Sequence, residues 1–129
     1  MKSYDPLKAP DSKEWLELDE GERLQLIEQF HKRARVKLPN RKLHSVFHAI
    51  VETQLLDGQL PVKNALDRLM SEGLDRHEAI HAIGSILSVT VYGIIKGKAP
   101  ENPNIEYFRQ VGELTAEKWR QSGQQGAAD

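Results

Sequence analysis

The sequence contains no cysteine, so neither disulfides nor thiolate ligands can contribute to this fold. Any metal site must therefore use nitrogen and oxygen donors. A net charge of −1 provides no general attraction to nucleic acid or to anionic membranes. The first residues have no apolar run of the signal-peptide type, and we expect no stretch of about 18 apolar residues that could span a membrane. We therefore expect a cytoplasmic protein.

Strand patterns and internal repeats are also missing, and what remains is typical of an all-α protein. The 129 residues are 39% hydrophobic and 29% charged, which is ordinary for a single globular domain. We expect an extended arm over residues 1–10, an N-terminal helical region over 11–40, a histidine-rich core over 41–108 and a frayed tail over 121–129. The predicted fold is a compact bundle of about five helices without a sheet.

Helix boundaries follow from capping residues and apolar spacing. Asp19 and Glu22 fit a capping box, and Asp75 is placed to cap a later helix. Pro61 suits the first turn of a helix, and Gly58 suits a left-handed C-terminal cap. Pro39 should stop the first long helix, and Asn40 should cap the next. The predicted helices cover residues 20–37, 41–56, 61–72, 76–96 and 105–120, after a short turn that carries Trp15 and Leu16.

Four of the five histidines form two pairs, each with a spacing of four residues. Residues four apart in a helix lie about 40° apart around its axis, so both imidazoles of a pair can reach one ion. Glu52 follows the first pair at the same spacing. We predict that the helices over residues 41–56 and 76–96 are adjacent, antiparallel or steeply crossed, and together bind a divalent metal ion. The candidate ligands are His44, His48, Glu52, His77 and His81.

Imidazole and carboxylate donors suit zinc, iron or manganese. Five donors exceed what a tetrahedral zinc ion requires. Either one histidine supports the ligands from outside, or the ion is five- or six-coordinate, which favours iron or manganese. Gln54 lies on the apolar arc of its helix, where its amide either orients a ligand or caps a nearby carbonyl.

If the site is catalytic, two glutamates are candidate general bases. The segment from His77 to His81 matches the HExxH pattern of zinc peptidases, in which Glu78 would be the general base. However, Asp75 and Arg76 precede it directly, and no sheet is predicted to hold a peptide substrate. Glu52 is the other candidate base. His31 stands alone in the first long helix, and we expect it to be exposed or partly buried.

A basic stretch over residues 32–37, continued by Arg41 and Lys42, supports another alternative, a metal-free interaction module that contacts nucleic acid. Cations near a helix C-terminus also offset the helix dipole, and no aromatic side chain is interleaved for base stacking. We therefore do not expect nucleic-acid binding. A second subunit covering the apolar faces, in a homo-oligomer, is a further alternative.

The stretch from His44 to Tyr107 resembles a family of small bacterial proteins of unknown function. The shared pattern is a histidine pair followed by Glu52-Thr-Gln54, then Leu60-Pro61 opening a helix. A second pair, in Leu74-Asp-Arg-His77-Glu-Ala-Ile-His81, opens a long helix, and a helix containing Tyr107 follows. The resemblance implies that the histidines, Glu52 and Gln54 act together, and it implies no particular reaction.

Overall fold

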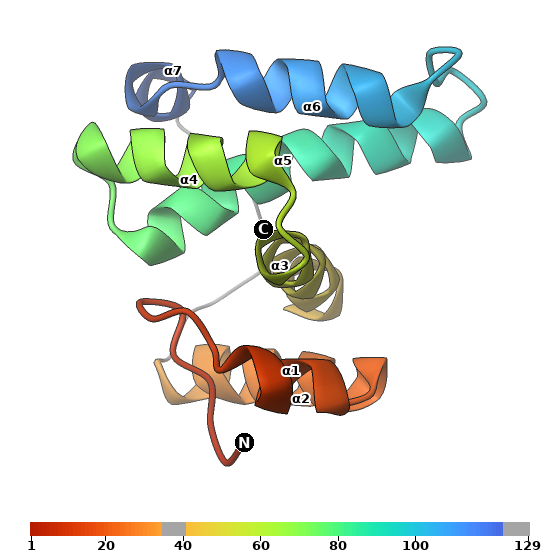
Figure 1. Cartoon of the computed structure of the whole chain (residues 1–129). Helices are drawn as coiled ribbons and strands as arrows, with labels where there is room; N and C mark the ends of the chain where they lie inside the picture. Colours follow the sequence, from red (N-terminus) through yellow and green to blue (C-terminus); the bar gives the residue numbers. More distant parts are fainter. Residues whose placement is uncertain (35–40, 123–129) are drawn as a thin grey trace.

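The computed structural model describes residues 1–34 and 41–122, and within these ranges it is all-α, with no strand (Figure 1). The prediction of an all-α fold is thus confirmed. Its helices are α1 (Ser12–Glu17), α2 (Glu20–Arg33), α3 (Arg41–Leu56), α4 (Leu60–Ser71), α5 (Arg76–Ile95), α6 (Pro103–Glu113) and α7 (Ala116–Gln121).

The predicted capping residues set the helix boundaries. The Asp19 carboxylate accepts a hydrogen bond from the Glu22 backbone N–H at 2.8 Å, and the Glu22 carboxylate accepts one from the Asp19 N–H at 2.9 Å. Asp75 caps α5 by accepting a hydrogen bond from the Glu78 N–H. Gly58 has a φ of 74°, which side-chain-bearing residues rarely adopt, and it follows α3 as expected.

The prediction of one C-terminal helix over residues 105–120 is wrong. The chain leaves the helical conformation at Leu114, where ψ is 133°, and Thr115 caps a new helix. Arg68 of α4 donates hydrogen bonds to the carbonyls of Val111 and Leu114, at 3.0 and 2.8 Å, and so satisfies acceptors that a continuous helix would have used. This break and the short α1 raise the count from about five helices to seven in the described residues.

The predicted first long helix also ends earlier than expected, at Arg33. The stop at Pro39 and the cap at Asn40 lie outside the described residues.

Helix α3 lies in the middle of the molecule. In Figure 1 it is seen nearly along its axis, with α1 and α2 below and α4 to α7 above. It packs against α2, α4 and α5, which confirms the predicted contact between α3 and α5, and these two helices cross steeply. One apolar core lies among α3, α4, α5 and the last two helices, and a second contains Tyr4, Trp15, Ile27 and Ala49.

Helix α5 is more apolar than we expected. Its 20 residues include a window with a mean hydropathy of 1.5, long and apolar enough to cross a membrane by length and composition alone. The expectation that no such window exists is therefore wrong. A core helix passes the same test, and α5 packs against α3, α4 and α6.

Candidate metal centre

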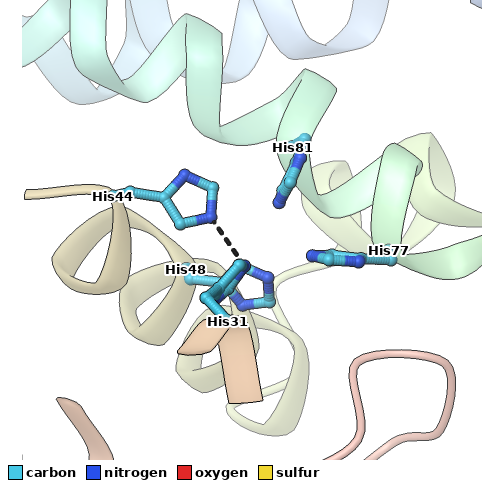
Figure 2. A group of neighbouring side chains, drawn as sticks. All are labelled: His31, His44, His48, His77 and His81. Carbon is cyan, nitrogen blue, oxygen red and sulfur yellow. Dashed lines mark hydrogen bonds between the residues drawn. The ribbon is translucent and has the colours of Figure 1, made fainter. Parts of the chain in front are cut away.

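All five histidines of the chain meet where α2, α3 and α5 converge (Figure 2). Each residue offers one ligand atom, and these atoms all lie within 4.8 Å of one another. The two predicted pairs face each other as expected, because each pair occupies one side of its helix and the two helices cross at that point. The fifth residue, His31, comes from α2. These side chains, the histidine cluster, are His31, His44, His48, His77 and His81.

The spacing of the cluster suits a single ion. With metal–nitrogen bonds of about 2.0–2.1 Å, neighbouring ligand nitrogens lie about 2.9 Å apart at a right angle and about 3.4 Å apart in a tetrahedron. The Nε2 atoms of His31 and His44 are 3.1 Å apart, which falls between these values. With the same bond lengths, two ligand nitrogens on opposite sides of an ion would lie about 4.1 Å apart. The ligand atoms here lie within 4.8 Å of one another, so the side chains would need to move inward only slightly to bind one ion.

The expectation that His31 is exposed or partly buried is wrong, since its exposed fraction is 0%. A signal for this was present in the sequence. His31 follows Ile27 by four residues and Leu24 by seven, which places it on the apolar face of its helix. A histidine in the buried stripe of an amphipathic helix needs polar partners inside the protein, and here other histidines surround it.

The ring of His31 is oriented by its own helix. Its Nδ1 lies 2.8 Å from the carbonyl oxygen of Ile27. A carbonyl can only accept, so Nδ1 carries the proton and donates it. In the neutral ring the lone pair is then on Nε2, which faces the other histidines.

His48 is oriented by a longer chain of hydrogen bonds. Arg76 donates to both carboxylate oxygens of Glu52, at 2.9 and 2.7 Å. The Tyr4 hydroxyl donates its only proton to the same carboxylate and lies 3.0 Å from Nδ1 of His48. Tyr4 can therefore only accept from His48, so Nδ1 is the protonated nitrogen. The lone pair of His48 is again on Nε2, as metal ligation requires.

Four histidines of the cluster are neutral near pH 7, namely His44, His48, His77 and His81. Burial is the largest cause and lowers the pKa of His44 to about 3 and that of His77 to about 4. Burial lowers the pKa of His81 to about 2, and repulsion from the neighbouring imidazoles adds to this effect. The pKa of His48 is also held well below its usual range by burial. Neutral imidazole is the form that binds a metal ion.

Three nitrogens of the cluster have no hydrogen-bond partner among the described residues, although all are buried. They are the Nε2 atoms of His48, His77 and His81. A buried polar atom without a partner costs on the order of 1–3 kcal/mol. Three such atoms at one point are the arrangement expected of a metal site, in which each nitrogen would donate a lone pair to the ion.

Glu52, the one carboxylate among the predicted ligands, lies beside the cluster rather than in it. It is fully buried, and both its oxygens accept hydrogen bonds from Arg76. Its link to the histidines passes through Tyr4, 48 residues away in the sequence. Neither Tyr4 nor Arg76 was predicted to belong to the site.

The other predicted residues lie away from the cluster. The Gln54 side-chain oxygen accepts a hydrogen bond from the Tyr107 hydroxyl at 2.8 Å, so the amide has a partner outside the cluster. Glu78 is half-buried and does not belong to the group of candidate metal ligands. In the basic stretch Lys32 and Lys42 are exposed. Residues 35–37 and the side chain of Arg41 are not among the parts of the chain that the structure describes.

Comparisons of the chain with protein families, with curated proteins and with solved structures found no match. The resemblance to a bacterial family of unknown function therefore stays a prediction.

Proposed function

We propose that this protein binds one divalent transition-metal ion through the histidine cluster. The observation that carries the proposal is the convergence of five ligand atoms within 4.8 Å, in a site where three of the nitrogens are buried without partners. Hydrogen bonds to Ile27 and Tyr4 leave the lone pairs of His31 and His48 facing inward. Supporting hydrogen bonds of this kind usually accompany metal-binding histidines.

The donor set limits the choice of metal. Imidazole suits zinc, iron, copper and nickel, whereas carboxylate and carbonyl oxygens suit manganese and magnesium. With Glu52 held by Arg76, five nitrogens are available and no carboxylate. Five donors exceed the four of a structural zinc site, so the proposal favours iron over zinc and both over manganese.

In this proposal Glu52 and Tyr4 are positioning residues rather than ligands. Glu52 anchors Tyr4, and the Tyr4 hydroxyl oxygen accepts a hydrogen bond from His48 Nδ1–H, which fixes the direction of the ligand nitrogen. Glu52 is also a poor general base, since Arg76 and Tyr4 already occupy its oxygens. We place this site in a small cytoplasmic metal-binding protein from bacteria.

The test is the metal content of the protein, purified without a histidine tag and measured by inductively coupled plasma mass spectrometry. We expect close to one ion per chain, and loss of that ion in the double variant His48→Ala/His81→Ala. His31→Ala should also lose metal, although the sequence pattern alone would not have selected it. The matched control is Gln54→Ala. Gln54 lies in α3, like His48, but outside the cluster, and this substitution removes only its hydrogen bond with Tyr107.

Glu52→Gln distinguishes a ligand from a positioning residue. If Glu52 is a positioning residue, the substitution should lower metal affinity by about 10- to 100-fold, and one ion should still bind at saturating metal. Absence of metal from the parent protein, persisting after incubation with iron(II), zinc and manganese, would refute the proposed function.

A further inference from the structure

A small cavity adjoins the histidine cluster on the side where α3 and α5 cross. Its volume is about 10 Å³, close to the space that one water molecule needs. Three histidines of the cluster line this cavity, together with apolar or small residues. The lining residues are His44, His48, His81, Phe47, Ile80 and Gly84.

The other two histidines of the cluster, His31 and His77, do not line this cavity. An ion held by all five would therefore lie beside a cavity that borders three of its ligands, His44, His48 and His81. An iron ion accepts six ligands, and the cluster supplies five nitrogens. A six-coordinate ion would therefore take one ligand from solution, and the cavity is the space at which such a ligand can sit.

We propose that the cavity is the binding site for an exogenous sixth ligand of at most two non-hydrogen atoms, at which a diatomic gas such as nitric oxide takes the place of water. This inference rests on the proposed metal site. The size limit follows from the walls, because Phe47 and Ile80 are buried and packed in the main core. A larger ligand would have to displace these side chains.

Gly84 allows a sharp test of the position. A methyl group added there would lie 3.9 Å from Cβ of Phe47, an ordinary contact, so alanine fits without strain. The same methyl group would occupy part of a cavity that has room for about one water molecule. Gly84→Ala should therefore fold and bind metal normally while excluding the sixth ligand. The matched control is Gly112→Ala in α6, where an added methyl group meets nothing within 4 Å.

The experiment loads each protein with iron(II) without oxygen, confirms the iron content, and titrates with nitric oxide. Iron–nitrosyl formation is followed by absorption and by electron paramagnetic resonance. We expect binding in the parent protein and in Gly112→Ala. In Gly84→Ala, affinity should be weaker by about tenfold or more, the factor that corresponds to about 1.4 kcal/mol of overpacking.

Iron-loaded parent protein that forms no nitrosyl complex would overturn this inference and leave the metal site standing. Equal nitric oxide affinity in the parent protein and Gly84→Ala would also overturn it, because the ligand would then bind elsewhere. Failure of the parent protein to take up iron(II) or another ion would overturn both proposals together.

Discussion

Acid should destabilise the metal-free protein strongly, because burial holds four histidines of the cluster in the neutral form. The ordinary histidine pKa of 6.5 applies to the unfolded chain, whereas in the folded protein the pKa of His77 is about 4, that of His44 about 3 and that of His81 about 2. Between these values and pH 6.5 the unfolded chain binds more protons than the folded protein. The free energy of unfolding must therefore fall as the pH decreases below 6.5.

The size of this effect follows from the number of histidines. At pH 5.5, one unit below the unfolded pKa, each neutral buried histidine lowers the free energy of unfolding by about 1.4 kcal/mol. His48, whose pKa is also lowered, makes a fourth contributor, so the loss approaches about 6 kcal/mol. A domain of this size is typically stable by about 5–15 kcal/mol, so the metal-free protein should be near its unfolding midpoint around pH 5.

The assay is urea unfolding followed by circular dichroism at pH 7.5, 6.5 and 5.5, after removal of metal with a chelator. The pH dependence of the free energy of unfolding gives the number of protons taken up. A His77→Gln/His81→Gln variant keeps two of the four contributors and should show about half the slope. A parent protein that loses less than about 2 kcal/mol between pH 7.5 and 5.5 would refute the reasoning, since the histidines would then be accessible to protons in the folded state.

Other substitutions test the surroundings of the site. Tyr4→Phe keeps the packed ring and removes the hydroxyl, so metal affinity measured by isothermal titration calorimetry should fall by about 10- to 100-fold; an unchanged affinity would contradict the positioning role. Arg76→Met leaves the charge of Glu52 buried without its partner and should cost about 3–5 kcal/mol in urea unfolding, whereas a cost below about 1 kcal/mol would show that the pair is not needed. Gly73→Ala forces a side chain into a φ of 106° and should lower the melting temperature, whereas Gly112→Ala, in an open helical position, should raise it slightly; the opposite order would contradict the backbone argument.

Local features of the fold were predictable because they depend on short-range rules. The bounds of α3 follow from its apolar spacing and from Gly58, and the start of α5 follows from Asp75. The pairing of four histidines also followed, since a spacing of four residues fixes a common helix face. The break at Leu114 was missed because the apolar pattern continues across it, and the carbonyls at the break are satisfied by Arg68, which is distant in sequence.

Contacts between distant segments could not be predicted in the same way. The spacing correctly placed Glu52 on the same face as His48, but whether it binds metal or an arginine depends on what other segments bring to it. Arg76 approaches from α5 and Tyr4 from the N-terminal arm, and no periodicity connects these positions. The burial of His31, which we did not predict, could have been inferred from the sequence, because this residue lies on the apolar face of its helix.

The docking of the N-terminal arm has a consequence for the order in which the site is built. Tyr4 is synthesised before its partners, which lie 44 and 48 residues later, and the carbonyl of Pro6 accepts a hydrogen bond from Arg76, 70 residues later. Contacts over such separations form late, since long loops must close first. Stopped-flow refolding in which metal uptake preceded the burial of Trp15 would contradict this order. We expect that the arm waits for α5 to emerge from the ribosome, and that the ion enters a nearly finished protein rather than nucleating its folding.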